Sequence, residues 1–207
     1  LGLTAGFGML VGSELARKKK YDVMSQGLHG GGVGILYLSI YASFGLYHLI
    51  GFVPAFVIMS GVTLYCGFWS IKTNWLSSAV IGVAGGFLTP LLFGTKALSP
   101  AFLFSYIALL DMGVLYISVH KKWRFLNLVS FLSTYILFNM WFTIDYEPEQ
   151  WPVAFLFASV FFALFCLLSI SHNLMRKEKS DGIDLTLVLS NGMVYFYEML
   201  NILKPHA

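Results

Sequence analysis

The 207-residue sequence is short of charge, because only 11% of its residues are Asp, Glu, Lys or Arg. A soluble domain carries about 25%. Hydrophobic residues make up 57% of the chain, and so few charged side chains could not cover that much apolar surface in water. The scarcity of charge therefore excludes an ordinary soluble domain and indicates a membrane protein.

Cysteine is scarce as well. Cys66 and Cys166 lie singly inside apolar runs, without a second cysteine or a histidine at ligand spacing. This pattern excludes a disulfide framework and predicts no metal site. We interpret both cysteines as small packing residues, and no cofactor is expected.

Catalytic motifs are also absent. The sequence contains no GxSxG elbow, no HExxH helix and no paired-carboxylate motif, so no catalytic residue can be named. The absence favours a protein that is not an enzyme but leaves that question open. The net charge of +3 comes from basic residues in short clusters between apolar runs, which does not indicate nucleic-acid binding.

Long apolar stretches dominate what is present. Each complete stretch is long enough to cross a hydrocarbon core of ~30 Å at 1.5 Å per residue. We predict an all-α, polytopic transmembrane helical bundle built as helical hairpins, with one transmembrane region over residues 1–207. The chain starts without Met inside an apolar run, so we expect further spans of the same chain outside it. The eight predicted spans cover about 1–16, 30–50, 53–71, 76–93, 101–119, 125–143, 153–171 and 185–203.

Basic residues are distributed unevenly over the connections between these spans. Lys and Arg in short loops stay on the cytoplasmic side of a membrane. With eight spans, all basic residues except Lys96 and Lys204 fall on one side. We predict a multi-pass protein of the bacterial inner membrane whose basic loops are cytoplasmic. The residues on that side are Arg17, Lys18, Lys19, Lys20, Lys72, Lys121, Lys122, Arg124, Arg176, Lys177 and Lys179.

Glycines recur at the four-residue spacing that lets membrane helices approach closely. Gly27, Gly34, Gly82 and Gly86 are predicted to pack helices against each other. Pro90, near the end of the fourth span, is a candidate kink because proline removes a helical hydrogen bond.

The glycine-rich run has a second interpretation, because it opens the helix predicted at 30–50. Free N–H groups at a helix N-terminus bind anions. Gly30, Gly31 and Gly32, beside Lys18 and Lys19, are therefore candidates for contact with a lipid phosphate or another anion. Close helix packing remains the alternative.

Asp111 stands in the middle of the fifth predicted span, where a bare carboxylate is costly. The carboxyl group must be protonated, paired or facing a polar cavity. Two interpretations stay open: Asp111 carries a proton or binds a coupling ion, or it is hydrogen-bonded to a neighbouring helix.

The last span carries Glu198, with Asn191 and Tyr195 at helical spacing on the same stripe. The stripe faces a cavity or packs against spans outside the chain, and Lys204 could reach toward Glu198. Near the other end of the chain, Glu14 is predicted to pair with Arg17 three residues later.

Three blocks resemble a known family. They are GLHGGGVGILYLSIYASFGLYHLI at 27–50, AVIGVAGGFLTPLLFGT at 79–95 and SYIALLDMGVLYISVHKKWRFLNLVSF at 105–131. Together they resemble the large bacterial membrane proteins of domain-of-unknown-function family 2339, over roughly residues 5–145. The resemblance implies a longer protein with more spans and brings no assigned activity.

Two functions follow from these features. The first is transport or handling of a lipid-linked or anionic small molecule along a path lined by Asp111 and Glu198. The second is a non-catalytic membrane scaffold assembled through small-residue helix faces, and an intramembrane enzyme ranks behind both. The expected partners are the lipid bilayer and further spans of the same chain, with homo-oligomer formation left open.

Overall fold

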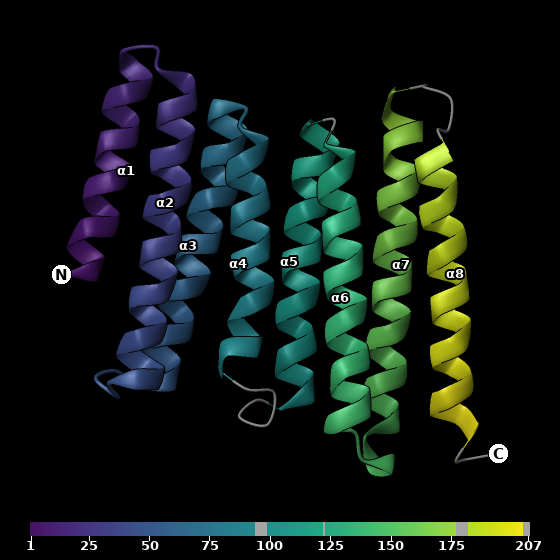
Figure 1. The fold of residues 1–207 in the computed structure, drawn as a ribbon. Helices are drawn as coiled ribbons and strands as arrows, with labels where there is room; N and C mark the ends of the chain where they lie inside the picture. The colour runs from purple at the N-terminus through teal and green to yellow at the C-terminus, as the bar shows by residue number, and fades with distance from the viewer. Residues whose placement is uncertain (94–98, 122, 177–181, 205–207) are drawn as a thin grey trace. The chain divides into compact units, whose positions relative to one another are not determined.

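The computed structural model describes residues 1–93, 99–121, 123–176 and 182–204, which form helices and short connections with no strand among them (Figure 1). The predicted all-α fold is confirmed. In chain order the elements are α1 (Gly2–Lys18), α2 (Asp22–Tyr41), the π-helix η1 (Ala42–Leu46), α3 (Phe52–Thr73), α4 (Leu76–Phe93), α5 (Pro100–His120), α6 (Arg124–Ile144), the 3₁₀-helix η3 (Pro148–Gln150), α7 (Trp151–Arg176) and α8 (Gly182–Leu203).

Five of the described helical segments are long and apolar enough to cross a membrane. They lie in α3, in α4, in α5 up to Ser118, in α6 from Phe125, and at Pro148–Leu168 in η3 and α7. The helices α1, α2 and α8 are not among them. Each of these three carries polar residues within its length, including Glu14, His29 and Glu198. An apolar helical bundle of this kind fits a membrane protein.

One predicted span is placed wrongly. The stretch 30–50 was expected to be a helix, but α2 begins at Asp22 and ends at Tyr41, and the chain then forms η1 up to Leu46. Asp22 lies in the first turn of α2, where a negative charge is favourable to the helix dipole. The other predicted spans match helices of the structure, with ends that differ by a few residues.

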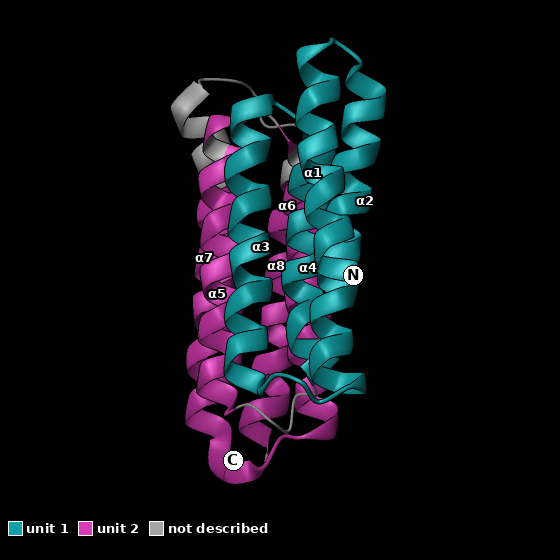
Figure 2. Cartoon of the chain, turned by 90° about the vertical axis from the view of Figure 1, so that its left-hand side faces the viewer, with its two compact units in different colours: residues 1–94 teal, residues 95–207 magenta. Residues whose placement is uncertain are grey.

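The chain divides into two compact units, residues 1–94 with α1 to α4 and residues 95–207 with α5 to α8 (Figure 2). The single transmembrane region over 1–207 stays a prediction.

In the first unit α1 and α2 form a close hairpin. The Ser13 hydroxyl donates to the Ser25 carbonyl over 2.9 Å, and the Ser25 hydroxyl donates to the Ser13 carbonyl over 2.6 Å. Further along the hairpin, a Cβ added to Gly32 would lie 3.0 Å from the Gly6 carbonyl oxygen. Small residues therefore let these two backbones approach each other.

The second unit has an aromatic core. The ring of Phe104 lies 4.9 Å from the ring of Trp141 and 5.2 Å from that of Phe138, measured between centroids. Phe161 from α7 packs against Phe104 and Phe138, and all four side chains are buried. This core holds α5, α6 and α7 together and fixes the faces that carry the polar residues.

Candidate functional site

Asp111 lies buried at the middle of α5 and is bound by two hydroxyl groups of α6. Ser130 donates to its Oδ1, and Thr134 lies 2.9 Å from Oδ2 and 3.0 Å from Oδ1. All three side chains are buried. The carboxyl group is thus satisfied by hydroxyl groups of a neighbouring helix.

Asn191 and Glu198 of α8 face the same helix α6. Tyr135 donates its hydroxyl to Asn191 Oδ1 over 2.6 Å, and Asn139 Nδ2 donates to Glu198 Oε1 over 3.2 Å. Asn191 also donates to the Phe162 carbonyl of α7 over 3.0 Å. The stripe of α8 therefore packs against α6 and α7 of its own chain, a third arrangement beside the two that the sequence left open.

Glu198 is only partly satisfied. Its side chain is 3% exposed, and the second carboxyl oxygen, Oε2, is buried without a hydrogen-bond partner. Lys204, expected to reach toward it, is exposed, and within the described part of the chain the ion pair found is Glu14–Arg17 instead. A buried polar oxygen without a partner is unusual in proteins.

The helix α6 presents two different polar faces. Ser130 and Thr134 bind Asp111, while Tyr135 and Asn139 bind α8. The two sets of contacts adjoin at the consecutive residues Thr134 and Tyr135, while Ser130 and Asn139 lie about 13.5 Å apart along the axis of α6. The structure thus gathers the predicted polar residues Asp111, Asn191 and Glu198 around one helix.

A second polar cluster lies in the first unit around His29, which is 1% exposed. Ser78 donates its hydroxyl to the Cys66 carbonyl over 3.2 Å, so its oxygen accepts from His29 Nε2, 3.0 Å away. This assigns the ring proton to Nε2 and leaves Nδ1 as an acceptor, which is buried without a partner. The rings of Tyr65, Trp69 and Trp75 surround the imidazole.

Basic side chains gather beside this cluster. Arg17 binds Glu14 at 2.7 Å, which confirms the predicted pair. The Arg17 guanidinium carbon also lies 5.9 Å from the centre of the Trp69 ring, and Lys72 Nζ lies 5.2 Å from it. Cationic side chains from the ends of α1 and α3 therefore lie beside one indole ring. The other predicted basic positions Lys96, Lys122, Lys177 and Lys179 lie outside the described residues.

The basis for an anion site at Gly30, Gly31 and Gly32 is not found in the structure. Because α2 begins at Asp22, these glycines lie within the helix, where their N–H groups are used by the helix itself. Lys18 and Lys19 are exposed at the end of α1.

The four glycines predicted to pack helices lie in different surroundings. A Cβ added to Gly82 would lie 2.5 Å from the Cys66 Cβ, so α3 and α4 approach closely there. Gly86 is buried in the same helix. In contrast, a Cβ added to Gly27 or Gly34 would meet nothing within 4 Å. These two glycines do not lie at a close helix contact of their unit.

Pro90 lies inside α4, which continues to Phe93. The preceding Thr89 donates its hydroxyl to the Gly85 carbonyl over 2.8 Å. Both residues are buried. The kink itself stays a prediction.

Several residues of these clusters were not singled out from the sequence. Tyr135, Asn139 and His29 were missed. The polar residues of α6 recur at helical spacing, and this pattern could have predicted a polar face on that helix. No cluster of three or more His, Cys, Asp or Glu that could hold a metal ion occurs in the ranges that the structure describes.

The fold and the buried polar clusters together define a membrane-embedded, all-α helical protein. The sequence matches the family described as predicted membrane protein (DUF2339) over residues 1–200, and the chain belongs to that family. No curated protein and no solved structure matches the chain.

Proposed function

We propose that this protein transports or handles a lipid-linked or anionic small molecule, and that the polar cluster around α6 is its working site. One observation carries the proposal: Asp111 and Glu198, on α5 and α8, are both buried and both bound by α6. Ionisable groups inside a membrane are costly and are typical of ion and substrate pathways.

The two carboxyl groups support different roles. Asp111 accepts from two hydroxyl groups, so that both of its carboxyl oxygens have a partner. Glu198 accepts from one amide, and its second oxygen has no partner. That oxygen suits a group that binds and releases a proton, or that accepts a hydrogen bond from the substrate. Two carboxyl groups with unequal surroundings can take different proton-transfer roles.

The substitution Asp111→Asn tests this function, because Asn keeps the size of the side chain and removes its charge. The protein is reconstituted in vesicles with a trapped pH-sensitive dye or with a fluorescent phospholipid. Proton flux or lipid movement across the bilayer is then measured. We expect Asp111→Asn to reduce the rate to that of protein-free vesicles while the amount of protein in the membrane is unchanged.

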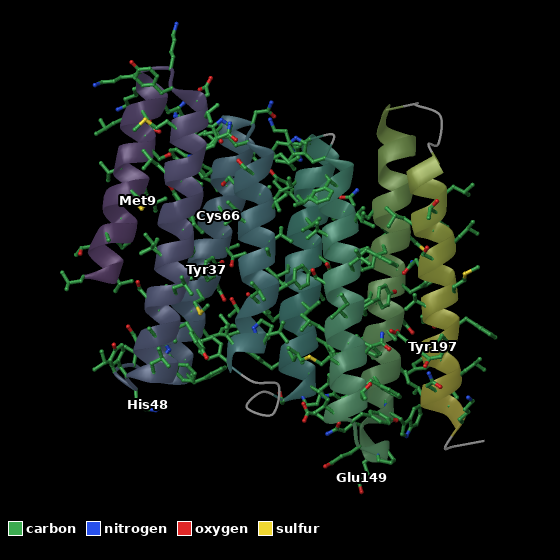
Figure 3. The ribbon with its side chains drawn as sticks, in the orientation of Figure 1. Met9, Tyr37, His48, Cys66, Glu149 and Tyr197 are labelled. Carbon is green, nitrogen blue, oxygen red and sulfur yellow. The ribbon has the colours of Figure 1, made fainter. Side chains whose placement is uncertain are left out.

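The control is Glu149→Gln, which removes an exposed carboxyl group from the connection between α6 and α7 (Figure 3). This variant should keep the wild-type rate. Wild-type protein without flux in either assay, or Asp111→Asn with full flux, would contradict the proposal. If Asp111→Asn is lost from the membrane, a structural role replaces the functional one.

A scaffold is the second candidate, and the α1–α2 hairpin favours it. There Gly6 and Gly32 bring two backbones into contact, as helix-assembly faces do. In that case Asp111→Asn would change little, and substitution of Gly32 would break assembly.

We further propose that the basic ends of the helices face the cytoplasm of a bacterial cell, since Lys and Arg near short loops set orientation. Arg17 and Lys72 at one end of the first unit, and the acidic connection with Glu147 and Glu149 in the second, support this orientation.

A further inference from the structure

The basic end of the first unit holds a feature that the proposed function does not use. Two cations from helices far apart in the sequence, Arg17 of α1 and Lys72 of α3, lie over the same ring of Trp69. We propose that Arg17, Lys72 and Trp69 form a binding site for the phosphate of an anionic membrane lipid.

The charge balance at this place supports an anion. Glu14 binds Arg17 in a two-pronged pair, with 2.8 Å from Nε to Oε2 and 2.7 Å from Nη2 to Oε1. That carboxylate offsets one of the two positive charges, whereas no ion pair of Lys72 is found among the described residues. Two like charges beside one ring repel each other, and a phosphate between them would remove that repulsion.

The indole adds a polar group to the two cations. Its Nε1 is buried and donates to no acceptor. An indole nitrogen is a donor only, so a partner for it would have to be an acceptor. The neighbouring His29 has its ring stacked on Trp69 at 6.2 Å between centroids and so restricts where the indole can lie.

The surroundings favour a lipid over free phosphate. Leu64 and Phe68, on α3 just before Trp69, are 65% and 67% exposed. An apolar surface that leads up to a cationic headgroup site is the shape that an acyl chain with a phosphate fits.

The test uses the whole protein in detergent, titrated with phosphatidylglycerol or phosphatidylcholine and observed by native mass spectrometry. Wild-type protein should retain phosphatidylglycerol in preference to phosphatidylcholine. The variant Lys72→Gln should weaken phosphatidylglycerol binding about fivefold, the effect of one basic residue near an anionic headgroup. Removal of both Lys72 and Arg17 should weaken it about 25-fold.

The matched control is Lys18→Gln, which removes the same charge from an exposed position next to Arg17. This variant should change binding less than about twofold, because an exposed charge without a fixed ligand contributes little. If Lys18→Gln and Lys72→Gln weakened phosphatidylglycerol binding equally, the lipid would be held by general electrostatic attraction. That result would overturn the proposed site. Equal binding of the two lipids by wild-type protein would overturn it as well.

A last experiment distinguishes binding of the lipid from binding of free inorganic phosphate. Inorganic phosphate at millimolar concentration is added to the complex with phosphatidylglycerol. We expect the lipid to stay bound, since phosphate alone has no contact with the apolar surface of α3. Displacement of the lipid by inorganic phosphate would assign the site to the free ion and refute the lipid assignment.

Discussion

At the scale of single residues, glycine positions differ sharply in what surrounds them. Gly85 lies against the ring of Tyr37, where an added Cβ would be 2.4 Å from the Cζ atom. Gly34 of α2 has no atom within 4 Å of the same added Cβ. Tyr37 is itself held by Thr63, 2.6 Å from its hydroxyl, so the ring cannot simply move away.

The substitution Gly85→Ala should therefore lower the free energy of unfolding by about 1–3 kcal/mol, the cost of overpacking a well-packed site. The same change at Gly34 should leave stability unchanged or raise it by about 1 kcal/mol, because alanine is the better helix former. Thermal unfolding in detergent measures both. Equal effects of the two substitutions would refute the close contact between Gly85 and Tyr37.

The sequence could predict that Asp111 is buried, because it stands alone in the middle of an apolar run. It could not predict Ser130 and Thr134 as the partners of Asp111, since that requires the register between α5 and α6. For Glu198 the polar stripe on its own helix could be predicted from the sequence. The helices that this stripe contacts could not be predicted. The burial of His29 Nδ1 without a partner could not be predicted either, because distant parts of the chain surround the imidazole.

At the scale of helices, α2 shows where sequence patterns stop being sufficient. Its first turns contain Asp22, Gln26 and a run of glycines, a composition typical of a loop. The helix is nevertheless formed there, because Ser25 bonds to Ser13 and Gly32 packs on Gly6. Such tertiary contacts are not visible in local composition. The later helices, which are bounded by proline or by basic clusters, could be predicted to within a few residues.

The α1–α2 hairpin allows a direct test of helix packing. In a chain whose Cys66 and Cys166 are replaced by alanine, the double variant Ser13→Cys and Ser25→Cys should form a disulfide, because the two hydroxyl oxygens are 3.2 Å apart. Adding Gly32→Leu should abolish the crosslink, since a larger side chain would push α1 away from the Gly6 carbonyl.

The control for the hairpin is Gly27→Leu, which lies on the same helix but faces open space and should leave the crosslink intact. A crosslink that persists with Gly32→Leu would contradict the close backbone contact. The yield of the disulfide is measured by mobility on a denaturing gel.

At the scale of the whole molecule, we predict the orientation in the membrane from where basic and acidic residues lie. Lys20 and Lys121 lie in connections predicted to be cytoplasmic, and Glu149 lies in the connection predicted to be outside. Single cysteines at these three positions, in a chain without Cys66 and Cys166, are treated with a membrane-impermeant maleimide on intact cells. We expect Glu149→Cys to react at once, and Lys20→Cys and Lys121→Cys only after the membrane is opened. Labelling of Lys20→Cys and Lys121→Cys from opposite sides would refute this topology.

The arrangement of α6 has a mechanical consequence. Neighbouring residues on a helix point about 100° apart, so a turn of α6 by one residue would bring Tyr135 to where Thr134 stands. Such a turn would strip Asp111 of a hydroxyl and Asn191 of its phenol in one movement. Asn139, which binds Glu198, would turn with the same helix. Under the proposed function, rotation of α6 would therefore couple the contacts of both carboxyl groups.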